Sequence, residues 1–248
     1  MENPLHPFEL HPLVQISLFG VDISLNKAVV MMWVVIALVS ALLLLAASAR
    51  RLVPTKLQSL AEIFVEFIRG MILDTIGQQG MRFFPFIATL FLFILFCNLL
   101  GLIPGSYTVT SQIVVTAAFA LFVYGMSLVV GFALHGVKFL GILVPAGTPT
   151  WMLPLMIPIE VVSQLARPLS LAVRLFANMT AGHTVLAVLF GMALSLPFLI
   201  GWLPFVVTVG INGLEVFIAF IQAYIFTILT CVYLGDAVTL HEHAEHAH

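Results

Sequence analysis

Three uncharged apolar runs, at residues 28–49, 84–104 and 112–134, are each long enough to cross a lipid bilayer as one helix. About 20 helical residues cover the roughly 30 Å of hydrocarbon in a membrane. Two later apolar stretches, 159–195 and 204–238, exceed that length. A chain that is 62% hydrophobic and 8% charged also lacks the polar residues that a soluble surface needs. We therefore predict an all-α polytopic membrane protein with about five membrane helices, the first at 28–49.

The last two stretches are predicted to form a hairpin of long, strongly tilted helices. A membrane helix that is longer than the bilayer is thick accommodates the excess by tilting. Proline interrupts helical hydrogen bonding, so a kink is expected at Pro168. The segment 196–204 has a proline near each end and is predicted to be the turn of the hairpin.

Residues 50–82, between the first two membrane helices, contain five of the nine Lys and Arg, and none of the nine precedes Lys27. Cytoplasmic loops concentrate these residues. We therefore predict that this connection and the C-terminus are cytoplasmic, and that the N-terminal segment 1–27 lies on the outer side. Within the connection, residues 56–80 show a polar stripe offset from an apolar face. This pattern indicates an amphipathic helix at the membrane interface or, alternatively, a soluble connecting helix.

The remaining segments are predicted to be a transmembrane hairpin at 83–138, a proline-punctuated segment followed by the tilted hairpin at 139–238, and a His/Glu-rich tail at 239–248. The tail has metal-ligand residue types without an enclosing scaffold, so we interpret it as a solvated end and expect no metal and no cofactor. Cys97 and Cys231 lie in apolar stretches, which indicates buried thiols rather than a disulfide.

Arg174 is a permanent cation in an apolar run that has no acidic residue between Glu160 and Glu215. A central membrane Arg costs about 2.5 to 3.5 kcal/mol on insertion scales, and guanidinium does not escape by deprotonating. The residue therefore indicates a transport pathway or a partner outside this chain. The alternative is an Arg that snorkels to the headgroups from a helix end.

Arg174 belongs to a polar stripe on one face of its helix. At 100° per residue the polar side chains of this helix fall within a window of about 80°. The members of this stripe are Glu160, Ser163, Arg167, Ser170, Arg174 and Asn178. His183 falls about 180° away, so we expect it to face different surroundings.

One antiparallel register of the hairpin places His183 level with Glu215 and Arg174 level with Gln222, with its midpoint near residue 198 in the predicted turn. A buried His beside a carboxylate is a titratable pair suited to a proton entry path. The alternative is an interhelical hydrogen bond that only joins the helices. Glu160 lies about 20 Å from Arg174 in the other direction. Polar groups on both sides of one cation therefore indicate two aqueous half-paths.

Three runs closely resemble subunit a of the F-type ATP synthase, bacterial type: PLSLAVRLFANMTAG at 168–182, QAYIFTILTCVY at 222–233 and CNLLGLIP at 97–104. The resemblance implies a proton-translocating stator beside a rotating ring of c subunits, and Arg174 matches the essential arginine of the family. It also implies that Asn178 and Gln222 lie near that arginine, that Glu160 lies on the cytoplasmic path, and that a linked His/Glu pair lies on the outer path. In some relatives the two members of the pair are exchanged, which leaves open whether His183 or Glu215 receives the proton first.

The same resemblance implies the c ring, the peripheral-stalk b subunits, the whole F-type complex and the lipid bilayer as partners, and no nucleic acid. It implies no covalent chemistry in this chain, and a bacterial inner membrane with the mitochondrial inner membrane as the alternative. Two other classes predict different sequences. A secondary transporter for an anionic solute predicts repeated halves, and none is visible. A haem-binding subunit needs paired intramembrane His ligands, but His183 is the only His deep in an apolar segment.

Overall fold

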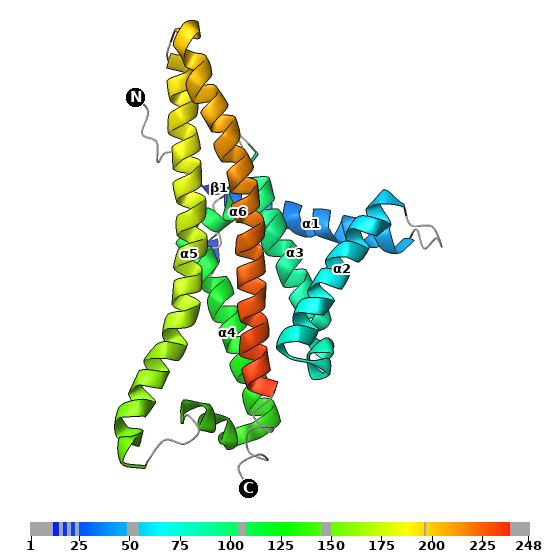
Figure 1. Ribbon diagram of the computed structural model, residues 1–248, viewed down its shortest axis with the longest axis vertical. Coiled ribbons are helices and arrows are strands. Elements are labelled where there is room, and N and C mark those ends of the chain that lie inside the picture. The colour runs from blue at the N-terminus through cyan, green and yellow to red at the C-terminus, as the bar shows by residue number, and fades with distance from the viewer. Residues whose placement is uncertain are drawn as a thin grey trace.

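The computed structural model describes residues 12–14, 17–18, 21–22, 25–48, 55–103, 108–144, 150–195 and 197–238. Nearly all of these residues are helical (Figure 1). Five of the described helices are long and apolar enough to cross a membrane. They are α1 (Lys27–Ser48), α3 (Phe84–Gly101), α4 (Ile113–His135), α5 (Leu153–Ser195) and α6 (Phe198–Val238). The predicted all-α polytopic class is therefore confirmed.

Short elements connect these helices. Two antiparallel strand pairs precede α1, in a segment for which no regular structure was predicted, because strands of two or three residues leave no periodic pattern in the sequence. The strands are β1 (Pro12–Val14), paired with β4 (Leu25–Asn26), and β2 (Ser17–Leu18), paired with β3 (Val21–Asp22). The 3₁₀ turns are η2 (Gln78–Phe83), η3 (Val109–Ser111), η4 (Gly136–Leu143) and η5 (Thr150–Met152). The C-terminal tail lies outside the described residues.

The predicted amphipathic segment forms α2 (Lys56–Thr75). Thr55 caps its N-terminus, because the side-chain oxygen accepts a hydrogen bond from the backbone N–H of Gln58 at 3.4 Å. The helix ends five residues before the predicted boundary at 80, and Gly77 follows with a φ of 82°, a conformation that favours glycine. Ile68 and Ile72 are buried against the other helices, so the apolar face of α2 packs on the bundle.

The two last helices form the long hairpin that the sequence predicts. α5 has 43 residues and α6 has 41, so at 1.5 Å per residue each is about 60 Å long, twice the thickness of the hydrocarbon layer. In Figure 1 they run side by side along the long axis of the molecule, while α1 runs across that direction. The hairpin and α1 cannot both stand along the membrane normal. Because α1 has the length of one direct crossing and the hairpin helices are about twice as long, we expect the hairpin to be the tilted part.

The predicted hairpin turn at 196–204 is wrong in its length. α6 begins at Phe198, where the N–H of Gly201 donates to the carbonyl of Pro197 at 2.9 Å, and Pro204 lies inside the helix. α5 likewise begins at Leu153, six residues before the predicted start at 159, and contains Pro158 and Pro168. In an apolar environment unpaired backbone groups are costly, so the chain keeps its helix and gives up single hydrogen bonds at the prolines. Figure 1 shows α5 bending toward its N-terminal end.

The core lies where α2, α3 and α6 meet. Phe67 contacts the rings of Phe91, Phe220 and Tyr224 at centroid distances of 5.7 to 6.0 Å. In the most apolar 18-residue stretch of α6, 44% of the residues are buried inside the protein, whereas in that of α5 only 11% are. α6 is therefore covered more extensively by the other helices than α5 is, and α5 presents most of its surface to whatever surrounds the protein.

Candidate functional site

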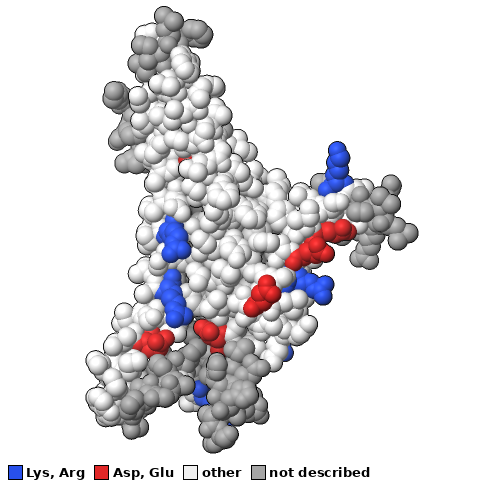
Figure 2. Space-filling model, viewed as in Figure 1, with Lys and Arg blue, Asp and Glu red and all other residues white. Residues whose placement is uncertain are grey.

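Arg174 lies on the outward face of α5. Leu171 and Leu175 on either side of it are buried, whereas Arg174, Ser170 and Asn178 are exposed, as the helical period of the predicted stripe requires. Arg174 makes no ion pair or hydrogen bond with any residue in the described part of the chain. Figure 2 shows basic side chains exposed on the side of the molecule that α5 occupies. Arg174 is therefore a cation for which the described residues supply no counter-charge.

Arg167, seven residues earlier on the same stripe, has a different environment. One terminal nitrogen of Arg167 lies 4.0 Å from Oδ2 of Asp236, near the end of α6, and both side chains are partly exposed. Further toward the start of α5, Glu160 accepts a hydrogen bond from Nε2 of Gln164 at 3.0 Å. Both Glu160 and Ser163 are half-buried. This end of the hairpin therefore gathers several charged and polar groups.

Asn178 joins the stripe to the interior. Its Nδ2 donates to Oε1 of Gln222 on α6 at 3.3 Å, and Gln222 is 1% exposed. The Nε2 of Gln222 has no hydrogen-bond partner among the described residues. Asn98 of α3 is fully buried beside it and donates to the carbonyl of Ala219 at 3.4 Å. Unpaired buried polar atoms in native proteins are the usual positions of ordered water.

Glu215 and His183 lie further along the hairpin. Glu215 is 7% exposed, and neither of its carboxylate oxygens has a hydrogen-bond partner in the described residues. It packs against α5 at Gly182, where an added Cβ would lie 2.8 Å from Cδ of Glu215. For Glu215 the predicted register is therefore right to within one residue, but the predicted pair of Arg174 and Gln222 does not form, because Gln222 contacts Asn178, one helical turn further along α5. The hydrogen bond of His183 goes elsewhere, because its Nε2 lies 2.7 Å from the hydroxyl of Thr108, just before η3.

The predicted site residues thus form two groups along the hairpin, one on each side of Arg174. Glu160 and Ser163 lie at one end of α5, whereas Asn178, Gln222, His183 and Glu215 follow Arg174 toward the other end. Sequence reasoning missed three residues, namely Asn98, Thr108 and Asp236. A signal was available for two of them, because Asn98 is the one amide side chain in its apolar run and Asp236 is the one acid near the end of the last stretch. The sequence carries no comparable signal for Thr108, because threonine is a common residue in polar turns.

Comparison with known proteins gives the same assignment from independent observations. The family model described as ATP synthase A chain matches residues 29–235. ATP synthase subunit a of Magnetococcus marinus is 50% identical over 245 residues, covering 96% of this chain and 94% of that protein. The subunits a of Rhodospirillum rubrum and Rhizobium johnstonii are 46% and 48% identical, over 97% and 95% of this chain and 100% and 97% of their own lengths. With its membrane helices, its exposed Arg174 and these relatives, the chain is a multi-pass bacterial membrane protein that belongs to the ATP synthase subunit a family.

Proposed function

We propose that this chain is the proton-translocating stator subunit of the membrane motor of an ATP synthase, and that Arg174 separates two offset aqueous half-channels. The observation that carries the proposal is the position of Arg174. It is exposed on the least buried of the long helices, without a partner in the described residues, and buried or half-buried polar side chains lie on both sides of it along the hairpin. A cation so placed needs an anion from another subunit, because a lone charge facing lipid is costly.

The outer half-channel comprises His183, Glu215, Asn178 and Gln222. The unpaired carboxylate oxygens of Glu215 and the unpaired Nε2 of Gln222 favour a line of water molecules along this side of α6. Protons enter past His183 and Glu215 and reach a carboxylate on the ring of c subunits. The protonated, neutral acid then travels around through the lipid.

The cytoplasmic half-channel comprises Glu160, Ser163 and Ser170. The ring acid returns at this side of Arg174 and releases its proton, because an opposite charge within about 4 to 6 Å lowers a carboxylate pKa by about 1 to 3 units. The fixed cation also repels protons that would otherwise leak straight across. Each charge moved through 100 mV supplies about 2.3 kcal/mol, which the ring turns into rotation.

The partners in this proposal are the c ring along α5 and α6, and the peripheral-stalk b subunits that hold the chain still. The N-terminus lies on the periplasmic side of the inner membrane and the C-terminus in the cytoplasm, in keeping with the concentration of Lys and Arg between α1 and α3.

A disulfide cross-link tests the placement of the ring. Ser170→Cys, one helical turn from Arg174, is expected to cross-link to a cysteine near the carboxylate of the ring helix in the assembled complex, as measured by gel mobility after oxidation. The matched control is Val129→Cys, which is 66% exposed on α4 and should give no product with the same ring cysteine. The native Cys97 and Cys231 are buried and can stay in place. Equal yields from both positions would contradict the proposed placement.

The contact between Gly182 and Glu215 gives a second test. An alanine at Gly182 would place its Cβ in the space of the Glu215 carboxylate, which is the mobile end of a flexible side chain and can move aside without unfolding the helix. Gly182→Ala is therefore expected to assemble normally but to lower ATP synthesis about tenfold or more, since misplacing a reacting group by about 1 Å can cost about 100-fold. Gly191→Ala on the same helix meets no atom within 4 Å and serves as the control. Wild-type synthesis in Gly182→Ala would show that the position of Glu215 is unimportant.

A further inference from the structure

Two arginines lie on one face of α5 but differ in their ion-pair partners. Arg167 and Arg174 are seven residues apart, so they are nearly eclipsed and about 10 Å apart along the helix axis. Both are exposed. Arg167 has Asp236 at 4.0 Å, whereas Arg174 has no ion pair in the described residues. A ring carboxylate that moves along this face meets both positions.

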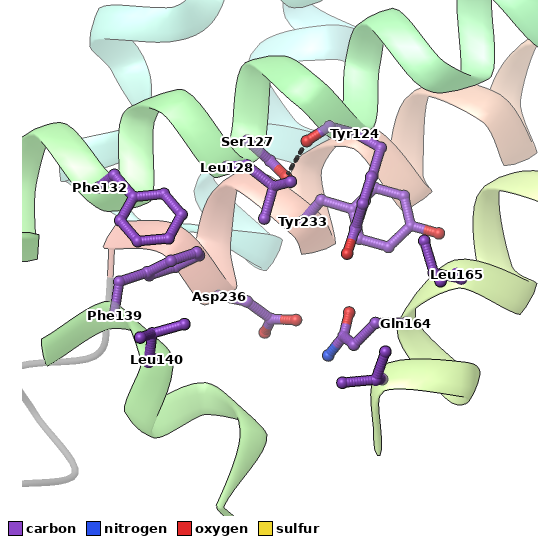
Figure 3. Close-up of a pocket in the computed structure, with 11 residues that line it drawn as sticks. Tyr124, Ser127, Leu128, Phe132, Phe139, Leu140, Gln164, Leu165, Tyr233 and Asp236 are labelled. Atoms are coloured by element: carbon purple, nitrogen blue, oxygen red, sulfur yellow. Dashed lines mark hydrogen bonds between the residues drawn. The ribbon is translucent and has the colours of Figure 1, made fainter. Parts of the chain in front are cut away.

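The fold brings Asp236 close to Arg167. Asp236 lies two residues before the end of α6, in a cavity of about 260 Å³ lined by α4, η4, α5 and α6. Figure 3 shows its carboxylate between Phe139 and Gln164, directed toward α5. The cavity wall is largely apolar, with Leu165 and Phe132 among its lining residues, so few other groups compete for the carboxylate.

The other titratable groups around the pair do not replace Asp236. The Oε1 of Glu160 accepts a hydrogen bond from Gln164, and Glu160 forms no ion pair with Arg167 in the described part of the chain. Tyr124 and Tyr233 stack edge to face on the α4 and α6 side at 6.0 Å. His135 of α4 lies 3.0 Å from the carbonyl of Ala237 through its Nε2. Asp236 is therefore the one anion that the described structure gives to Arg167.

We propose that Asp236 is a positioning residue that neutralises Arg167, so that a passing ring carboxylate meets a single uncompensated cation, Arg174. The inference rests on the proposed function. Asp236 itself does not touch the ring acid in this scheme. It acts by holding a compensating negative charge 4.0 Å from the guanidinium of Arg167.

The consequence of losing Asp236 follows from the electrostatics of the ring acid. A free Arg167 within about 4 to 6 Å would lower the pKa of that acid by about 1 to 3 units on the cytoplasmic side, which weakens proton binding there by about ten- to a thousandfold. ATP-driven pumping requires the ring acid to take up a proton on that side. Pumping should therefore slow, and its pH profile should move to lower pH.

The test uses the complete ATP synthase in inverted membrane vesicles, with ATP-driven proton pumping measured against cytoplasmic-side pH. Asp236→Asn is expected to lower pumping about tenfold at pH 8 and to move the profile down by about one pH unit or more. Arg167→Gln combined with Asp236→Asn is expected to restore both rate and profile to within about twofold, as a double-mutant cycle requires of a coupled pair. Asp74→Asn, an exposed acid on α2, is the matched control and should pump like the wild type.

Three outcomes would overturn the inference. If the double variant is no better than Asp236→Asn, the carboxylate acts on its own account, for example as a proton carrier. If neither variant assembles, Asp236 serves packing. Arg174→Ala is measured in the same experiment. If Arg174→Ala loses activity but Asp236→Asn pumps like the wild type, only the inference about Asp236 is contradicted. If Arg174→Ala has wild-type activity, the proposed function itself is contradicted.

Discussion

Replacing Arg174 by alanine is expected to abolish coupled ATP synthesis while the complex still assembles. Arg174 is exposed and makes no described contact, so its removal costs the fold little. In the proposed mechanism, however, the ring acid loses the cation that would lower its pKa by about 1 to 3 units. We expect synthesis to fall at least about 100-fold, and passive proton flow through the membrane motor to rise, because the positive barrier between the two half-channels is gone.

Both effects are measured in vesicles, as ATP formation driven by an imposed proton gradient and as the decay of that gradient without nucleotide. Arg69→Ala is the matched control, because Arg69 is also an exposed arginine but lies on α2, away from the stripe on α5. It should synthesise ATP at the wild-type rate. Coupled synthesis at that rate in Arg174→Ala would remove the central proposal, since no other described residue of α5 between Glu160 and the turn is a free cation.

The secondary structure was predictable to the extent that length and hydrophobicity decide it. α1, α3 and α4 begin or end within three residues of the apolar runs, because in a membrane an apolar run has no better conformation than a helix. The errors occur at proline. Pro204 and Pro158 suggest boundaries by the rules of soluble helices, but both lie inside helices here. The cost of an unpaired backbone in lipid outweighs the single hydrogen bond that each proline removes.

The site was predictable where one helix determines it. The period of α5 alone groups Arg174 with Arg167 and Asn178. The predicted register brings Gln222 to this part of α5, although Gln222 contacts Asn178 and not Arg174. Residues from other elements were not predictable in the same way. Thr108 reaches His183 from a turn 75 residues away, and the position of Asn98 against Ala219 depends on how α3 packs on α6. No periodicity along one segment carries that information.

Exchanging His183 and Glu215 is expected to preserve more ATP synthesis than replacing either one. The two positions lie at the same level of the hairpin, as the contact between Gly182 and Glu215 indicates. The hydroxyl of Thr108 can donate as well as accept, so it can bind a carboxylate at position 183 as readily as an imidazole. The variant that carries both His183→Glu and Glu215→His therefore keeps one titratable base and one acid on the outer path.

Single replacements remove one of the two groups. A positioned proton-transfer group contributes about 10²- to 10⁴-fold in enzymes, so His183→Ala and Glu215→Gln are each expected to lower synthesis about 100-fold. The exchange should stay within about tenfold of the wild type, which is at least about tenfold better than either single replacement. Synthesis is compared in vesicles with equal amounts of assembled complex. Equal loss in all three variants would show that each residue acts only in its own place, and that the two do not form a functional pair.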